Sequence, residues 1–306
     1  MTQIRQTRVW LPLCAFLKLA GMCYGQFQFP TENPKPVFLV HGILVSGNNL
    51  AYLAARIIQN NPRTLVFNTY AYSGLASLTP LQQQLDGTLG QEFKNFSDAH
   101  PEGFHLIGHS QGALICRTLI QNYPQHNVRH FISIAGPQAG QYGIPTIIPQ
   151  PMPLVELPPL LTVGSALFYN PIAQRTLSIA NYWHDPFQDQ LYLRQNTFLP
   201  YYDNRIRSER SASYKEAFVK LRRFVAIQGP GDGVIDPWQS GDFSFYNRLG
   251  TVENYTQREV YTEDLFGLRT LDEDGRFIKY IQDGVEHFDW VFNNEVIEKY
   301  ILPNLD

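Results

Sequence analysis

Between residues 37 and 136, short apolar runs alternate with longer amphipathic ones, and this alternation constrains the fold more than any other feature. The apolar runs lie at 37–40, 64–70, 104–108 and 129–136, and the amphipathic runs lie at 49–61, 77–96 and 111–123. Short apolar runs bounded by glycine or proline are typical of strands that are buried on both faces. A strand–helix alternation predicts a mostly parallel sheet with helices on both faces, so we expect an α/β fold.

The longest amphipathic run, 77–96, predicts a single helix. Ser77 or Thr79 is the expected N-cap, and Pro80 falls in the first turn, where proline is tolerated. Further along the chain, the sequence predicts strands at 222–229 and 276–284 and a final helix at 289–301. The sheet predicted from the first half is therefore completed by strands from the second half.

A stretch of more than eighty residues separates the strand 129–136 from the strand 222–229. Such a stretch is too long for a structureless connection in a compact domain. The prolines at 145, 149, 151, 153, 158 and 159 exclude a long regular helix there, and therefore a transmembrane span. We expect an inserted lid or cap at about 140–215. The alternative is a surface subdomain that only completes the core.

The N-terminus has the layout of a secretory signal peptide. Arg5 and Arg8 precede the apolar stretch "VWLPLCAFLKLAG", and small residues follow near position 25. We expect residues 1–25 to be this signal and residues 26–306 to form a single domain. Because Lys18 interrupts the apolar stretch, an N-terminal helix that packs on the body is the alternative.

Composition narrows the possible partners. At 44% hydrophobic and 17% charged residues, the chain of 306 residues can bury a substantial core. A net charge of −3 gives no reason to expect nucleic acid or acidic membrane surfaces as partners. Asn95 and Asn254 begin glycosylation sequons, which would be modified only in the secretory pathway. The sequence gives no indication of the oligomeric state.

The segment GHSQG, residues 108–112, fits the G-x-S-x-G pattern of a nucleophile elbow. It lies between the predicted strand 104–108 and the predicted helix 111–123, which is the context that this motif requires. Open α/β sheets bind their ligands at the carboxyl ends of the strands, where Ser110 would lie. We therefore predict that Ser110 is a catalytic nucleophile.

A nucleophilic serine needs a base, and the base needs an orienting acid. In hydrolases with this elbow the partners follow in the order serine, acid, histidine. Asp232 lies in a glycine-rich turn directly after the strand 222–229 and is the predicted acid, with Asp236 as its rival. His287 follows the last predicted strand and is the predicted base. The alternative for His287 is an ordinary structural histidine.

An oxyanion that forms on a carbonyl needs preorganised N–H donors. The N–H of Gln111, at the start of a helix, is one expected donor. Ile43, after the turn at His41 and Gly42, is the expected source of the other. The alternative is that this is an ordinary turn at the end of a strand.

Other reactive side chains receive less weight. His109 is expected to support the turn, and Cys116 to be a small buried hydrophobe and the sole cysteine of the mature chain. His105 and His109 are four residues apart, but on a strand and a turn rather than on one helix face. The sequence contains no HExxH or CxxC pairing, so we expect neither a metal nor a cofactor.

From about residue 35 to its C-terminus, the chain resembles the palmitoyl-protein thioesterase family of lysosomal α/β-hydrolases. The resemblance rests on the segments "VHGI", "HLIGHSQGALICR", "AGPQAGQYG", "NYWHDPFQDQLYL", "GPGDGVIDPWQSGDFSFY", "VYTEDLFGLRTLDEDG" and "GVEHFDW". "GPGDGVIDPWQS" and "GPQAGQYG" are closer to the second branch of that family, the PPT2-like lysosomal thioesterases.

The resemblance implies an α/β-hydrolase fold and a lysosomal enzyme that cleaves long-chain fatty acyl thioesters, of acyl-CoA or S-palmitoyl type. The second branch is described as favouring the acyl-CoA type. The family's triad falls on Ser110, Asp232 and His287, and its oxyanion donors fall on Ile43 and Gln111. Relatives carry disulfides, whereas a mature chain with one cysteine forms none within itself.

We interpret the chain as an acyl-thioesterase that works through an acyl-enzyme, with the apolar segment 144–163 as a candidate wall of the acyl-chain site. Two alternatives stay open. The same triad cleaves oxygen esters, so the chain could be an esterase or lipase. A catalytically silent lipid-binding protein on a hydrolase fold is the other alternative, although a complete set of serine, aspartate and histidine disfavours it.

Overall fold

The computed structural model describes residues 33–143 and 164–306. The chain divides into two units, residues 1–33 and residues 34–306, and the elements below all belong to the second. The predicted signal peptide 1–25 and the predicted acyl-chain wall 144–163 lie outside the described residues.

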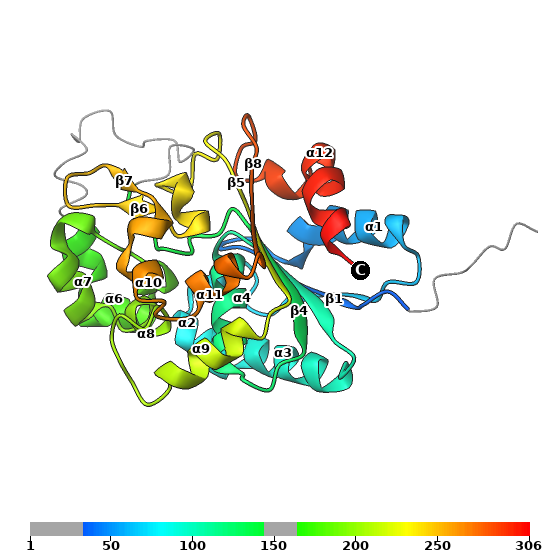
Figure 1. Ribbon diagram of the computed structural model, residues 1–306, viewed down its shortest axis with the longest axis horizontal. Coiled ribbons are helices and arrows are strands. Elements are labelled where there is room, and N and C mark those ends of the chain that lie inside the picture. Colours follow the sequence, from blue (N-terminus) through cyan, green and yellow to red (C-terminus); the bar gives the residue numbers. More distant parts are fainter. Residues whose placement is uncertain (1–32, 144–163) are drawn as a thin grey trace, which may run out of the picture. The chain divides into compact units, whose positions relative to one another are not determined.

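The centre of the fold is a six-stranded sheet in which every neighbouring pair of strands is parallel (Figure 1). Its order is β2-β1-β3-β4-β5-β8. The strands are β1 (Val37–Val40), β2 (Val66–Asn68), β3 (Phe104–His109), β4 (Val128–Ile134), β5 (Arg223–Gln228) and β8 (Phe277–Ile281). All four strands predicted in the first half and both predicted in the second are present. The predicted α/β-hydrolase fold class is confirmed.

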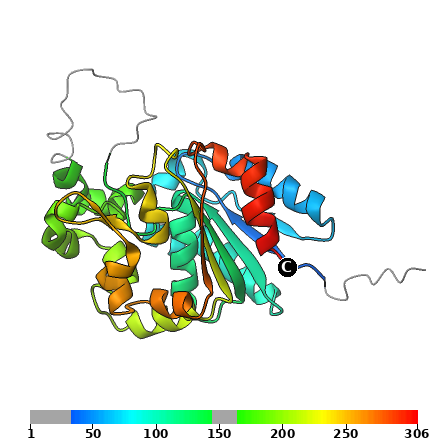
Figure 2. The same cartoon turned by 45° about the horizontal axis from the view of Figure 1, so that its top comes forward.

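Alternate residues of each strand face two separate cores. In β1, Phe38 and Val40 belong to one core, whereas Val37 and Leu39 belong to the other. The first core lies under α2 (Leu81–Asp86), α3 (Thr88–Ala99), α4 (Gln111–Asn122) and α9 (Ser211–Val219). The second core lies under α1 (Ala51–Asn60) and the C-terminal helical segment, which run side by side in Figures 1 and 2. A sheet that is covered on both faces explains why β1 is wholly apolar and why apolar residues predominate in β3, β4 and β5.

The single helix predicted at 77–96 is wrong. Residues Gly74–Leu78 form a 3-10 turn, and α2 and α3 follow as separate helices with a non-helical Gly87 between them. Neither Ser77 nor Thr79 caps α2. Instead the side chain of Asn181, a hundred residues away, accepts the Leu81 N–H at 2.8 Å. A cap supplied by a distant segment leaves no local signal in the sequence.

The predicted C-terminal helix 289–301 is less regular than expected. It begins as a 3-10 turn (Asp289–Val291), continues as α12 (Asn294–Val296) and ends as a π-helical turn (Ile297–Ile301). The side chain of Asn293 accepts the Val296 N–H at 3.1 Å, so a new cap interrupts the run and starts α12. Trp290 and Ile301, at its two ends, are nevertheless fully buried against the sheet.

The described part of the inserted region consists of short helices rather than a structureless loop. These are α6 (Pro171–Thr176), α7 (Asp189–Gln195) and α8 (Leu199–Tyr202). A second group, between β5 and β8, contains the hairpin β6 (Phe245–Tyr246) and β7 (Val252–Glu253), with α10 (Glu259–Thr262) and α11 (Leu268–Glu273). The two groups lie side by side in Figures 1 and 2. Among the described residues, no helix is long and apolar enough to cross a membrane.

Candidate active site

The carboxyl ends of the strands form one edge, and the pairing of the strands places the GHSQG turn there. Val40 of β1 pairs with Gly108 of β3, and His109 pairs with Ile134 of β4. Ser110 follows immediately and turns the chain from β3 into α4, with φ 58° and ψ −131°. A serine in this conformation is strained, as a nucleophile elbow requires.

The two glycines of the motif are required by close packing. A Cβ on Gly108 would lie 2.5 Å from the Cα of Ala113, and one on Gly112 would lie 2.3 Å from the carbonyl oxygen of His41. The first contact is between β3 and α4 across the turn. The second brings the loop after β1 against the first turn of α4. Glycine at 108 therefore lets α4 pack closely on the end of β3, and glycine at 112 lets the loop after β1 approach the start of α4.

Ser110, His287 and Asp232 form one continuous hydrogen-bonded chain. The Ser110 hydroxyl lies 2.8 Å from Nε2 of His287, and Nδ1 of His287 lies 2.9 Å from both carboxylate oxygens of Asp232. The backbone N–H of His287 also donates to the Asp232 carbonyl at 2.9 Å. The structure thus brings together three residues that were predicted from order and context. Ser110 is 122 positions from Asp232 and 177 from His287 along the chain.

Four donors surround the carboxylate of Asp232. Beside His287, the N–H groups of Val234 and Ile235 reach Oδ1 at 3.1 and 2.7 Å, and the indole N–H of Trp290 reaches Oδ2 at 2.8 Å. Burial alone would raise the pKa of Asp232, but these hydrogen bonds outweigh burial and hold the pKa below its ordinary value. In a serine–histidine–aspartate triad, an ionised acid keeps Nδ1 of the histidine protonated and Nε2 free to accept a proton.

Asp236, the rival acid, does not reach His287 by hydrogen bond. Its Oδ1 accepts the hydroxyl of Tyr246 at 2.6 Å, and burial raises its pKa. Its backbone is bound to the chain that leads to the inserted region, because the Asp236 carbonyl accepts the Tyr142 N–H at 2.8 Å. Asp236 therefore connects this loop to the inserted region, whereas Asp232 faces the base.

His109 supports His287 rather than Ser110. Its Nε2–H donates to the backbone carbonyl of His287 at 2.9 Å, and the two rings lie 5.0 Å apart. Burial and the nearby His287 ring lower the pKa of His109 to about 3, so this side chain stays neutral. His109, which was expected to support the turn at Ser110, therefore also holds the loop that carries His287.

The two expected oxyanion donors border the same space as Ser110. Gln111 is the first residue of α4, whose N–H cannot find a partner within the helix. Ile43 lies in the loop after β1 and lines the same cavity as Ser110 and Gln111. Among the described residues, no hydrogen-bond acceptor occupies the N–H of Ile43. Ile43 and Gln111 therefore remain the expected oxyanion donors.

The cavity in front of Ser110 is mostly apolar and has a volume of about 370 Å³. Its apolar lining includes Leu44, Val45, Leu78, Ile179, Tyr182 and Phe288. These residues come from the loop after β1, from the 3-10 turn Gly74–Leu78, from the inserted region and from the loop that carries His287. Ser110 itself is only 5% exposed, so a substrate must enter this cavity to reach the hydroxyl. The lining suits a hydrocarbon chain.

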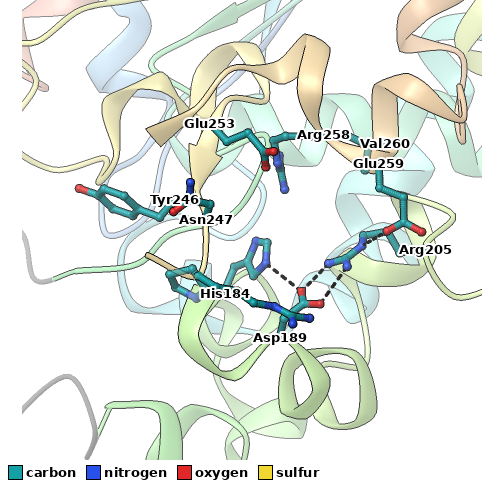
Figure 3. Close-up of a pocket in the computed structure, with 11 residues that line it drawn as sticks. His184, Asp189, Arg205, Tyr246, Asn247, Glu253, Arg258, Glu259 and Val260 are labelled. Atoms are coloured by element: carbon teal, nitrogen blue, oxygen red, sulfur yellow. Dashed lines mark hydrogen bonds and ion pairs between the residues drawn. The ribbon is translucent and has the colours of Figure 1, made fainter. Parts of the chain in front are cut away.

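A second cavity, of about 170 Å³, is polar and lies between the inserted region and the β6–β7 hairpin (Figure 3). Arg205 donates to both Asp189 oxygens and to Glu259. His184 stacks on Tyr192 and contacts Asp189 at 3.7 Å. The charges of the acidic and basic side chains that line this cavity largely compensate one another, and no serine or cysteine lines the cavity. We assign no chemistry to it.

Among the described residues, one cluster could hold a metal ion: His105, His130 and Asp306. His105 is near the start of β3, at the opposite end of that strand from Ser110. The Asp306 carboxylate already contacts His105 at 2.5 Å and Arg129 at 2.9 Å, so its charge is compensated. Cys116 is buried and unpaired within α4, and burial raises the pKa of its thiol well above the ordinary value.

Three residues form hydrogen bonds around the candidate site that the sequence did not predict. Trp290 binds the acid, the ring of His109 binds the carbonyl of the base, and Ser77 binds the loop that carries Ile43. Trp290 stands three residues after His287, within the quoted segment "GVEHFDW", and this proximity was the available signal. The contacts of the other two depend on tertiary packing.

A parallel sheet with a strained serine at a strand–helix turn, and with an acid and a histidine on later loops, defines the α/β-hydrolase class of enzymes. The chain belongs, more narrowly, to the palmitoyl protein thioesterase family, whose model matches residues 36–287. The resemblance inferred from the sequence is confirmed, as is the assignment to thioester hydrolases.

Relatives with similar sequences include proteins that are named lysosomal thioesterases. The lysosomal thioesterase PPT2 homolog of Drosophila melanogaster is 38% identical over 274 residues, covering 89% of this chain and 92% of that protein. Human lysosomal thioesterase PPT2 is 36% identical over 269 residues, covering 88% of this chain and 87% of that protein. Among solved structures, the lipase BlEst2 of Bacillus licheniformis aligns with a TM-score of 0.47 and 13% identity, covering 91% of this chain and 95% of that one.

Proposed function

We propose that this enzyme hydrolyses long-chain fatty acyl thioesters, of acyl-CoA or S-palmitoyl type, through an acyl-enzyme on Ser110. One observation carries the proposal. The hydrogen-bonded chain Ser110–His287–Asp232 ends at an apolar cavity of about 370 Å³. A nucleophile that faces a hydrocarbon-lined space suits a fatty acyl group, and membership of a thioesterase family favours sulfur as the leaving atom.

In the proposed mechanism, Nε2 of His287 accepts the Ser110 proton as the oxygen attacks the thioester carbonyl. The N–H groups of Ile43 and Gln111 stabilise the oxyanion. When the C–S bond breaks, His287 returns the proton to the leaving sulfur, and a thiol departs. His287 then deprotonates a water molecule, which attacks the serine ester. The bond to the Ser110 oxygen breaks, His287 returns the proton to that oxygen, and the fatty acid is released. Asp232 stays ionised and stabilises the imidazolium in both steps.

The electrostatics of Asp232 are compatible with activity in an acidic compartment as well as at neutral pH. The pKa of Asp232 lies below its ordinary value of 3.8, so this carboxylate remains ionised at pH values well below neutrality. Several relatives are named lysosomal thioesterases. We propose a lysosomal location, or secretion, reached through a signal peptide at 1–25.

Glycosylation belongs to the same proposal. Asn95 lies on the exposed side of α3, and Asn254 is exposed just after β7. Both side chains are therefore accessible to modification. The hydroxyl of Thr256, the third residue of the second sequon, donates to Oδ1 of Asn254 at 2.8 Å.

We further propose that the insertion at about 140–215 acts as a lid or cap. Its described part contributes Ile179 and Tyr182 to the wall of the cavity. A segment that forms the wall of a substrate cavity does more than complete the core.

The test compares palmitoyl-CoA with a matched p-nitrophenyl ester, using the full chain and Ser110→Ala. We expect hydrolysis of the thioester by the wild type and a loss of at least about a thousandfold in Ser110→Ala, since residual catalysis rests on the oxyanion hole and binding alone. Thermal unfolding verifies that the variant is folded. Ser110→Ala that retains thioesterase activity contradicts the mechanism. A wild type that cleaves only the oxygen ester contradicts the substrate class.

A further inference from the structure

Ser77 is a buried serine that forms no part of the hydrogen-bonded chain at Ser110, yet it contacts both sides of the oxyanion site. Its side chain is 2% exposed. The hydroxyl accepts the backbone N–H of Leu44 at 2.7 Å and donates to the carbonyl of Gly74 at 2.6 Å. The hydroxyl thus accepts one hydrogen bond from the backbone and donates one to it, and these two bonds fix the rotamer of Ser77.

The first contact holds the loop that carries Ile43. Leu44 has φ 60°, in the left-handed region that a leucine adopts only under constraint. Its N–H belongs to the peptide that directly follows Ile43, so anchoring this N–H sets the direction of the adjoining backbone. The neighbouring Val45 is also held, because its carbonyl accepts the Gly74 N–H at 2.8 Å.

The second contact holds the start of α4. The carbonyl of Ser77 accepts the side-chain amide of Gln111 at 2.9 Å. It also accepts the amide of Gln84, at 3.0 Å, which connects it to α2. Gln111 is fully buried, and the other atom of its amide group, Oε1, has no partner among the described residues. The bond to Ser77 is therefore what fixes this side chain.

We propose that Ser77 is a positioning residue for the oxyanion hole. Through its hydroxyl it sets the Ile43–Leu44 backbone, and through its carbonyl it fixes Gln111, so that the two N–H donors keep their spacing. This inference rests on the proposed function, because it assigns Ser77 to the oxyanion that forms during thioester hydrolysis. Ser77 does not touch the substrate in this role.

The experiment separates transition-state stabilisation from ground-state binding. Ser77→Ala removes the hydroxyl from Leu44 and keeps the carbonyl that binds Gln111. We expect kcat for palmitoyl-CoA to fall about tenfold, less than the hundredfold or more for the loss of a whole donor, with KM within about twofold. A long-chain trifluoromethyl ketone forms an oxyanion with the serine. Its affinity is expected to weaken by about the same factor as kcat, while that of the matching alcohol stays constant.

Ser73→Ala is the matched control. Ser73 directly precedes the 3-10 turn that contains Ser77, and its hydroxyl also donates to a backbone carbonyl, that of Tyr70 at 2.7 Å, but within the described part of the chain it forms no hydrogen bond with the loop after β1. The control is expected to keep wild-type kcat and ketone affinity. If Ser77→Ala yields too little folded protein, Ser77→Cys, with its weak sulfur acceptor, takes its place, and an intermediate loss is expected.

Two results would overturn the role of Ser77: unchanged kcat and ketone affinity in the folded variant, or an equal weakening of ketone and alcohol. Failure of the proposed function is distinguishable, because a wild type without thioesterase activity, or an active Ser110→Ala, reveals it independently of Ser77.

Discussion

Trp290 donates its indole N–H to Oδ2 of Asp232 at 2.8 Å, and the same oxygen accepts Nδ1 of His287 at 2.9 Å. Trp290 is fully buried in the second core, which lies under α1 and the C-terminal helical segment. An aromatic core residue therefore connects the packing of the C-terminal segment to the orientation of Asp232, the proposed catalytic acid.

Replacing the indole tests this connection. Trp290→Phe keeps an aromatic ring but leaves Oδ2 with one donor fewer, so we expect kcat to fall several-fold and the free energy of unfolding to fall by about 1–3 kcal/mol. The matched control is Trp183→Phe, which removes an indole hydrogen bond to Ser165 at 3.1 Å in another buried place. The control is expected to lose stability without a comparable loss in kcat. Equal kcat losses would contradict the role given to Trp290.

Stability at acid pH is expected to depend on buried neutral histidines. Burial lowers the pKa of His126 to about 4, while its ordinary value is 6.5. Between these values the unfolded chain binds a proton that the folded chain does not, so stability falls as pH falls. The titration of His126 is therefore expected to lower the free energy of unfolding at pH 5 by about 2 kcal/mol relative to pH 7.5.

His126→Gln removes this titration, and glutamine can still donate to the Ala217 carbonyl that His126 Nε2–H binds at 2.9 Å. We expect the difference in free energy of unfolding between pH 7.5 and pH 5 to shrink by about 2 kcal/mol in the variant. Urea denaturation at the two pH values measures it. The same pH-dependent loss in wild type and variant would show that His126 does not contribute.

Gly112 allows the loop after β1 to approach the nucleophile. In Gly112→Ala the new Cβ would lie 2.3 Å from the His41 carbonyl oxygen, so the loop must move away from Ser110. We expect a loss in kcat of about tenfold or more together with lower stability. Gly275→Ala is the control: it has φ 67° and nothing within 4 Å of its new Cβ. It is expected to lose about 1 kcal/mol of stability and no kcat. Full activity in Gly112→Ala would contradict the packing argument.

Ile179 is expected to influence the accepted chain length, since it lines the cavity from the inserted region. Ile179→Trp fills part of that space, so kcat/KM for palmitoyl-CoA should fall about tenfold or more relative to a short-chain acyl-CoA. Ile172→Trp, at an exposed position of α6, is the control and should leave the ratio unchanged. A ratio that is identical in both variants would place the acyl chain elsewhere.

The strands and the serine turn were predictable because their signals are local. β3 is a short, mainly apolar strand that leads into the GHSQG segment, and Asp232 and His287 each follow a strand in the expected order. In a parallel sheet, the carboxyl ends of such strands meet at one edge. Order along the chain therefore sufficed to group the three residues.

The predictions that failed depend on distant partners. The 77–96 run has helical periodicity, but Asn181 starts α2 at Leu81, and Ser77 is used by Leu44 instead of by a helix. The serine that was expected to cap a helix holds the loop beside Ser110. Tertiary packing decides that the Leu81 N–H binds Asn181 and that the Leu44 N–H binds Ser77. Neither pairing can be recognised in the sequence alone.

The most direct test is to identify the residue that becomes acylated. The full-length enzyme is mixed rapidly with palmitoyl-CoA and quenched in acid, and its peptides are analysed by mass spectrometry. We expect one palmitoyl ester, on Ser110, that forms before steady state, and none in Ser110→Ala. Turnover with an acyl group on another residue, such as Cys116, or with a covalent intermediate absent at every time point, would contradict the proposed mechanism.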